Sequence, residues 1–329
     1  MELKIVRSKY ILQIAFVCLF AVCCSTVVAQ KEPQYTQYMY NIGSFNPAYV
    51  GSVASPEIAA LYRAQWIDIP GAPRTIRIGA NLPMSNGKHG FGLNVVNDQL
   101  GPVTQTYFDL SYSFQVNLSA ETYLSFGLDV GGSALNVDFS KGTFENPGEP
   151  LNNQMISNFY PTIGAGLFMY SDDWYLGASA PNFLTEGIYN DEVATVVDDR
   201  LQFNFIGGYV FGLSENLKFK PAFLINAISG NPVNINVSAN FLISDKFTAG
   251  VSYRVNNAFS GLAGFQVAPS TFIGYSYDYN TNLLGDFNNG SHEIIVKFYL
   301  GTTGENRSNK VKDKELKNKP KQIDSPRFF

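Results

Sequence analysis

The feature that most constrains the fold of this chain is a strict alternation of apolar and polar residues. From Val233 to Ile243 every second residue is valine, isoleucine, alanine or phenylalanine, and asparagine and serine fill most positions between them. The stretch from Thr104 to Val116 has the same period. Because successive side chains of a strand point to opposite faces, each stretch predicts a β-strand with one apolar and one polar face. A helix would mix both kinds of residue on every face.

About fourteen such segments follow one another along the chain. A strand tilted by about 45° crosses a bilayer in roughly 9–11 residues, and bacterial outer-membrane barrels contain an even number of strands. The sequence therefore predicts an all-β protein, a transmembrane antiparallel β-barrel of about 14 strands over residues 56–300. The strands are expected at 56–66, 73–82, 88–97, 104–116, 121–137, 160–170, 173–181, 199–213, 216–227, 232–243, 246–255, 257–267, 270–279 and 291–300.

The connections between these segments differ in length in a regular way. Every second connection is long or irregular, and those between are mostly tight turns. Outer-membrane barrels carry long loops outside and short turns in the periplasm, so we expect both chain ends in the periplasm. The short link at 255–257 breaks this pattern and leaves the register there weakly defined. The long connections are expected at 67–72, 98–103, 138–159, 182–198, 228–231 and 280–290.

A soluble double-sheet protein is the structural alternative, because its strands alternate in the same way. Strand length and the asymmetry of the connections favour the membrane. Aromatic residues near strand ends favour it too, since outer-membrane barrels carry aromatic girdles at both interfaces. These residues are Trp66, Tyr107, Trp174, Tyr175, Tyr209, Tyr253, Tyr277 and Tyr279.

Composition argues against two other classes of protein. Only 15% of the 329 residues are charged, yet the mean hydropathy of −0.04 is too polar for a bundle of membrane-spanning helices. The net charge of −4 provides no basic surface for nucleic acid.

The first residues have the composition of a secretory signal peptide. Three basic residues precede an apolar run that ends in small residues, which predicts a cleaved signal peptide over 1–29. All three cysteines, Cys18, Cys23 and Cys24, lie within it. The exported chain would therefore contain no disulfide, no thiolate nucleophile and no cysteine-ligated metal.

Two segments lie outside the alternating pattern. Residues 30–55 carry five aromatic side chains among asparagine and proline. We expect them to form a short N-terminal cap on the periplasmic rim, the alternative being a plug or docking element. Residues 301–329 contain eight basic and four acidic residues, a net charge of +4, and predict a disordered basic periplasmic tail. Because the tail ends like a short peptide ligand, we expect it to bind a partner through Lys310, Lys312, Lys314, Lys317, Arg327, Phe328 and Phe329.

Residues suited to catalysis are scarce. The two histidines, His89 and His292, begin strands at opposite ends of the predicted barrel, and neither has an obvious triad partner. For His292 a polar interface position is favoured over a role in a hydrolase. Two distant histidines without cysteine do not predict a zinc site. We therefore expect no enzymatic activity and no cofactor.

Five charged residues are expected inside the barrel, because their parity places them opposite the apolar face. A charge facing lipid would cost roughly 2–4 kcal/mol at the membrane midplane. They form either a structural ion-pair network or a selectivity ring for a permeant, and a 14-stranded barrel is compatible with both. The residues are Arg63, Arg77, Asp109, Arg254 and Asp278.

Short stretches spread over residues 33–300 carry a resemblance to a known family. They include PQYTQYMYN from Pro33, NPAYVG from Asn46, YRAQW from Tyr62, PGAPRT from Pro70, NDQLGPVTQT from Asn97, LGASAPN from Leu176, LKFKPAFLINA from Leu217, FTAGVSYR from Phe247, IGYSYDY from Ile273 and GSHEI from Gly290. Together they resemble the PorP/SprF family of the type IX secretion system. The lysine-rich tail lies outside the resemblance.

The resemblance implies a non-enzymatic outer-membrane barrel that works in protein secretion or gliding-adhesin export, as an anchor or as a cargo-specific partner. The implied partners are outer-membrane lipid, periplasmic or outer-membrane proteins of the secretion system, and secreted cargo with a C-terminal targeting domain. The alternative function is an outer-membrane porin or small-molecule transporter. A third is a barrel hydrolase that depends on His292.

Overall fold

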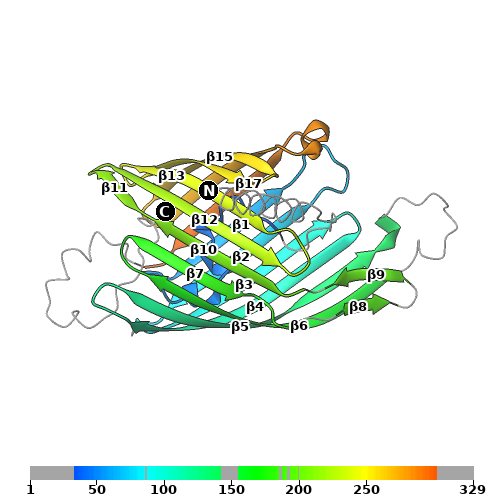
Figure 1. Cartoon of the computed structure of the whole chain (residues 1–329), viewed down its shortest axis with the longest axis horizontal. Helices are drawn as coiled ribbons and strands as arrows, with labels where there is room; N and C mark the ends of the chain where they lie inside the picture. Colours follow the sequence, from blue (N-terminus) through cyan, green and yellow to red (C-terminus); the bar gives the residue numbers. More distant parts are fainter. Residues whose placement is uncertain are drawn as a thin grey trace, which may run out of the picture.

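The computed structural model describes residues 33–85, 87–141, 155–184, 187–190, 193–198 and 200–301. One antiparallel sheet closes into a barrel of 14 strands, which confirms the predicted fold (Figure 1). Closure comes from β1 (Glu57–Ala64), which pairs with β17 (Ser291–Tyr299). No helix in these described ranges is long and apolar enough to span a membrane. The predicted signal peptide lies outside them.

Each predicted strand corresponds to a strand of the barrel. β10 (Gln202–Tyr209) and β11 (Phe211–Ser214) both pair with β12 and form one barrel strand, interrupted at Val210. The other barrel strands are β2 (Arg74–Pro83), β3 (His89–Leu100), β4 (Val103–Asn117), β5 (Tyr123–Asp138), β6 (Met155–Tyr170), β7 (Trp174–Ala180), β12 (Leu217–Ile228), β13 (Asn234–Ile243), β14 (Phe247–Arg254), β15 (Ala258–Ala268) and β16 (Thr271–Asn280).

Short elements lie between and before the barrel strands. The connection from β7 to β10 carries a separate hairpin of β8 (Gly187–Asn190) and β9 (Val193–Asp198), which sequence analysis did not predict. The 3₁₀ turns are η1 (Tyr38–Tyr40), η2 (Ile42–Ser44), η3 (Pro47–Tyr49), η4 (Phe139–Lys141) and η6 (Leu283–Phe287).

The two ends of the barrel differ in their connections. The short-turn end holds the links from β2 to β3 and from β13 to β14. In the second of these, Ser244 and Asp245 both have φ of 53°, as the two central residues of a type I′ turn require. The links from β4 to β5, β6 to β7, β11 to β12 and β15 to β16 lie at the same end, and the remaining links form the long-loop end. Two of its connections are nevertheless tight, namely Gly101-Pro102 and the link 255–257. The loop predicted over 98–103 is therefore wrong in extent, since β3 and β4 continue almost to their shared turn.

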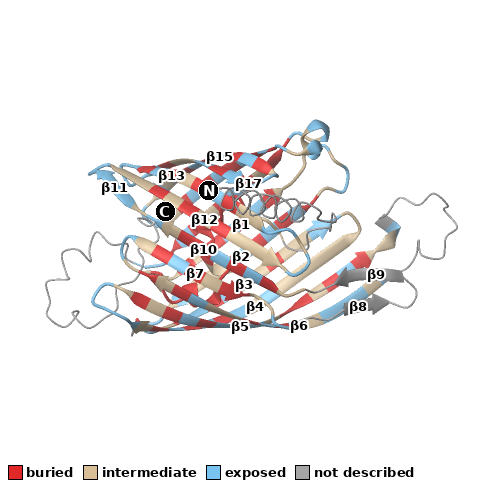
Figure 2. Cartoon of the chain, in the orientation of Figure 1, coloured by how far each residue is buried: buried red, intermediate tan, exposed pale blue. Residues whose placement is uncertain are grey.

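The barrel has its polar face inside and its apolar face outside. In β13, Asn236, Ser238 and Asn240 are buried, whereas Val237 and Phe241 are exposed. The same alternation of buried and exposed residues runs along most strands (Figure 2). A soluble sandwich would bury the apolar face instead, so this inversion is the arrangement of a barrel that faces lipid.

Two of the aromatic residues predicted for the girdles lie inside the barrel. Tyr175 is buried in the interior, and Tyr107 lines an interior cavity. Others do face outward, among them Tyr253, Tyr277 and Tyr279. Their position near a strand end was visible in the sequence, but their face depended on a register that a one-residue slip reverses.

The outward face should tolerate charge only near its edges. We expect Val237→Arg, at the middle of β13, to destabilise the folded barrel by about 2–4 kcal/mol, because the charge would meet the centre of the apolar band. Ile243→Arg is the matched control, since it faces the same way at the short-turn end of the same strand and should cost about 0–1 kcal/mol. Urea denaturation in lipid vesicles measures both. Equal effects at the two positions would contradict the assigned lipid face.

Candidate functional site: a plug inside the barrel

Residues 33–55, called the plug from here on, lie inside the barrel. At the long-loop end Thr36 contacts Asp278 of β16, and at the short-turn end Gly51 lies against Gly90 of β3. Nearly all plug residues between these points are buried. The prediction of a cap on the rim is therefore wrong for these residues, and their position is that of the plug considered as the alternative. Residues before Pro33 lie outside the described part of the chain.

The plug backbone approaches the barrel wall where the wall has no side chains. A Cβ on Gly127 of β5 would overlap the backbone of Pro47 and Ala48, and one on Gly90 would overlap Gly51. Glycine in a strand permits such close approach of a second backbone. These wall glycines therefore form the seat of the plug.

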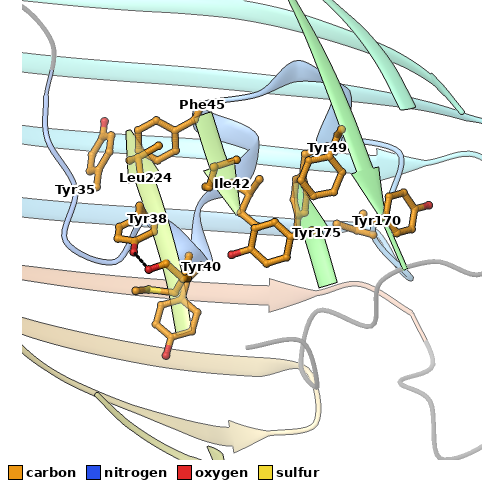
Figure 3. Packing of buried hydrophobic residues seen from close by; sticks show 14 of the residues in the cluster. Tyr35, Tyr38, Tyr40, Ile42, Phe45, Tyr49, Tyr170, Tyr175 and Leu224 are labelled. Carbon is orange, nitrogen blue, oxygen red and sulfur yellow. Dashed lines mark hydrogen bonds between the residues drawn. The ribbon is translucent and has the colours of Figure 1, made fainter. Parts of the chain in front are cut away.

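Aromatic side chains fill the space between the plug and the wall (Figure 3). Tyr49 stacks edge-on against Phe168 with ring centroids 5.5 Å apart, and Tyr40 lies 5.0 Å from Phe272. Such pairs contribute roughly 0.5–1.5 kcal/mol beyond the area they bury. The plug therefore packs as a core element, although it contains only single 3₁₀ turns.

The buried tyrosine hydroxyls of the plug are hydrogen-bonded. The Tyr38 hydroxyl donates to the carbonyl of Ala222 at 2.9 Å, and Tyr40 donates to Oγ1 of Thr248 at 3.3 Å. Both phenols therefore serve as hydrogen-bonding groups that attach the plug to the wall.

A cluster of buried charges, called the latch, holds the N-terminal part of the plug. Nη2 of Arg63 lies 2.7 Å from Oδ2 of Asp278, and Nη1 lies 3.1 Å from Oε2 of Glu293. Arg254 stands beside them and donates through Nε to Oδ1 of Asn236 at 2.8 Å. All four charged side chains are buried. Two cations and two anions make the latch neutral.

The plug enters the latch through two residues. Oγ1 of Thr36 donates to the Asp278 carboxylate at 2.8 Å and accepts from Nη1 of Arg63 at 3.1 Å. The backbone N–H groups of Thr36 and Gln37 donate to the Glu293 carboxylate at 3.0 and 2.8 Å. Hydrogen bonds to charged groups are stronger than neutral ones, so this is the firmest polar attachment of the plug.

All five predicted lumen charges lie inside the barrel, but they do not form one group. Arg63, Arg254 and Asp278 belong to the latch, whereas Arg77 donates to Asn94 at 2.7 Å and Asn94 donates to Asp109 at 3.4 Å. No ring of like charge is present among these described residues. Their arrangement fits a structural network better than a selectivity ring.

Several interior charges are not among the five predicted lumen residues. Glu293 completes the latch, and Glu57 pairs with Lys297 at 3.1 Å near the short-turn end. Their place in the alternating pattern would have predicted that they face the lumen, because each lies next to an outward-facing residue such as Ile294. Thr36 and Gln37 offered no comparable signal, since neutral polar residues are common in any loop.

Neither histidine faces the lumen. Nδ1 of His89 lies 2.7 Å from the hydroxyl of Tyr112, and Nδ1 of His292 lies 2.7 Å from that of Tyr275. These two pairs stand at opposite ends of the barrel, on its outward face. Among the described residues no group of three or more His, Cys, Asp and Glu residues could hold a metal ion. The predicted binding residues of the tail, from Lys310 to Phe329, lie outside the described part of the chain.

One cavity of about 90 Å³ lies beside the plug in the long-loop half of the lumen. Pro33, Tyr35 and Phe45 of the plug form one side, and Asp109 and Asp129 of the wall lie opposite. The cavity has room for a few water molecules or a small group. It is free space between the plug and the wall.

These observations describe a lipid-facing barrel with an internal plug, and comparison with known proteins assigns its family. Residues 27–298 match the family described as type IX secretion system membrane protein PorP/SprF. The chain belongs to the PorP/SprF family. It is thus an outer-membrane barrel of the type IX secretion system, as the resemblance of its short motifs predicted. No curated protein matches the chain.

Several solved structures are similar to this PorP/SprF protein. The CymD monoaromatic hydrocarbon channel has a TM-score of 0.51 and 10% identity, over 84% of this chain and 96% of that one. A Pseudomonas aeruginosa FadL homologue has a TM-score of 0.43 and 13% identity, over 82% and 95%. Acinetobacter baumannii Omp33 has a TM-score of 0.41 and 9% identity, over 76% and 100%. At these identities the likeness to CymD concerns the fold alone.

Breaking the latch should loosen the barrel as well as the plug. We expect Arg63→Gln to destabilise the protein by about 3–5 kcal/mol, because Asp278 and Glu293 would remain buried without their shared cation. The temperature at which the folded, fast-migrating form disappears on SDS gels measures the change. Lys218→Gln is the control, since it removes an exposed pair with Asp245 worth about 0–1 kcal/mol. Equal shifts in the two variants would show that the latch contributes no more than a surface ion pair.

Proposed function

We propose that this protein is a non-enzymatic component of type IX secretion and gliding-adhesin export, acting as an anchor for the machinery or as the partner of a particular cargo. The observation that carries the proposal is the plug. A segment that crosses the lumen, packs against wall glycines and is bound by a neutral latch suits a barrel that serves as a membrane-embedded platform. The two functional surfaces of such a platform are its rims.

The proposal includes an orientation in the membrane. The short-turn end faces the periplasm, as in other outer-membrane barrels. β17 ends there at Tyr299, so the basic tail over 301–329 would begin in the periplasm, where it would bind a periplasmic partner of the machinery. The long-loop end would face the cell exterior and meet exported cargo with its C-terminal targeting domain.

A porin or small-molecule transporter is the second candidate, favoured by the interior cavity and by the channel fold shared with CymD. A measurement of ion conductance distinguishes a porin from a plugged secretion component. We expect the purified protein to give little steady current in planar bilayers and Gly127→Val to raise it several-fold, because the added side chain would displace Pro47 and Ala48. Gly261→Val is the control, since a Cβ there meets nothing within 4 Å. A large current from the unaltered protein would favour the porin.

Gene deletion tests the secretion role itself. We expect loss of this barrel to reduce surface and secreted proteins that carry a C-terminal targeting domain, measured by comparing the two proteomes. Loss of one cargo would indicate a dedicated partner, and loss of many would indicate a core component. A chain truncated after Gly301 should assemble normally but lose co-purifying periplasmic proteins. An unchanged proteome after deletion would overturn the proposed function.

A further inference from the structure

One strand of the barrel wall has an edge that pairs with no other described strand along half of its length. β6 contains 16 residues and pairs with β5 along its whole length, from Tyr170 to Met155. Its other neighbour, β7, contains 7 residues, and its last ladder pair is Ala165 with Ala180. The long strands β3 to β6 therefore form a wall that continues past the end of β7 (Figure 1).

The loop after β7 covers only the first residue pair beyond the ladder. The N–H of Ile163 donates to Oδ1 of Asn182 at 3.2 Å, and its carbonyl accepts from the N–H of Phe183 at 2.8 Å. From Met155 to Thr162 no described residue pairs with this side of β6. We call Met155–Thr162 the open edge.

The contacts of Ile163 define which backbone groups the open edge presents. Along a strand the N–H and C=O of alternate residues point to the same side, and the β5–β6 register has no shift. Like those of Ile163, the backbone groups of Met155, Ser157 and Phe159 therefore point away from β5. Pro161 lies in the same series and lacks an N–H, which is tolerated because that position faces no ladder partner.

The part of the open edge from Met155 to Phe159 lies beyond the apolar part of the membrane. A tilted strand crosses the hydrocarbon in roughly 9–11 residues, so β6 has crossed it by about residue 160 when counted from Tyr170 at the short-turn end. An unpaired edge inside lipid would be costly, whereas one in water can pair with another chain. Met155 and Phe159 are 76% and 68% exposed on this edge, among the most exposed large apolar side chains of the described barrel strands.

We propose that the open edge binds an extended segment of an exported polypeptide by β-strand addition. The inference rests on the proposed function, because it specifies how the barrel would hold its cargo. The occupant follows from the chemistry of the edge. Unpaired N–H and C=O groups at every second residue match another extended backbone, and Met155 would pack against an apolar side chain of that strand.

Proline substitution tests the backbone contribution. We expect Ser157→Pro combined with Phe159→Pro to lower export of the cargo that gene deletion identifies by about tenfold or more, the effect of losing two backbone hydrogen bonds. The β5–β6 ladder should persist, because both N–H groups point away from it, and heat-dependent migration on gels checks this. Ser157→Ala with Phe159→Ala is the matched control. It removes the side chains but keeps both donors, so export should fall less.

Hydrogen exchange gives a second readout on the unaltered barrel. Adding the purified cargo should protect the amides of Ser157 and Phe159, which exchange freely without it. Protection in the barrel alone would mean that another part of this chain covers the edge. A disulfide between two copies of Ser157→Cys would assign the edge to a dimer of this protein. Either result overturns the inference.

The outcomes also separate this inference from the proposed function. If deletion abolishes export of a cargo but the double proline variant exports it normally, the open edge is not the binding site and the secretion role stands. If deletion itself leaves export unchanged, both fail.

Discussion

Closure of the sheet between β1 and β17 is the constraint on which the rest of the structure depends. Eight consecutive pairs, from Glu57 with Tyr299 to Ala64 with His292, join the first and last strands of the barrel. Without water in the hydrocarbon, an unpaired edge would leave a row of backbone groups unsatisfied. Closure removes that row, and it simultaneously brings Arg63 of β1 next to Glu293 of β17. The latch is thus built on the seam of the barrel.

The plug follows from the polar interior that closure creates. Side chains such as Ser238 and Asn240 face inward because their neighbours must face lipid, and buried polar groups need hydrogen-bonding partners. The plug supplies some of them, as when Tyr38 meets Ser238 at 2.9 Å. In return the plug, which has no long helix or strand of its own, receives its conformation from the wall. Plug and wall together form one core of hydrogen-bonded polar groups and packed aromatic side chains, enclosed by an apolar exterior.

The sequence predicted the barrel well because its signal was local. Alternation can be read within ten residues, and even the weak link at 255–257 has its expected place between β14 and β15. The features that the sequence did not reveal depend on tertiary contacts. Residues 33–55 have no period, so only their contacts distinguish a plug from a cap. Tyr175 was assigned to a girdle because its position in the strand was visible but its face was not. The interior position of Glu293 could have been predicted from its alternation with apolar residues in the strand. Thr36, which binds Glu293, lies in a segment without such a pattern.

The barrel is also unequal around its circumference, and this inequality bears on how it works. In the sector of β14 to β1 the strands contain 8 to 11 residues, little more than a bilayer requires, and the latch ties the plug to that side. In the opposite sector β4 to β6 contain 15 or 16 residues and rise beyond it. Strand length beyond the membrane contributes nothing to spanning it. The part of β4 to β6 that extends beyond the membrane is therefore better explained by interactions outside the membrane than by stability within it. Because the plug fills the lumen, a partner would bind on these outer surfaces.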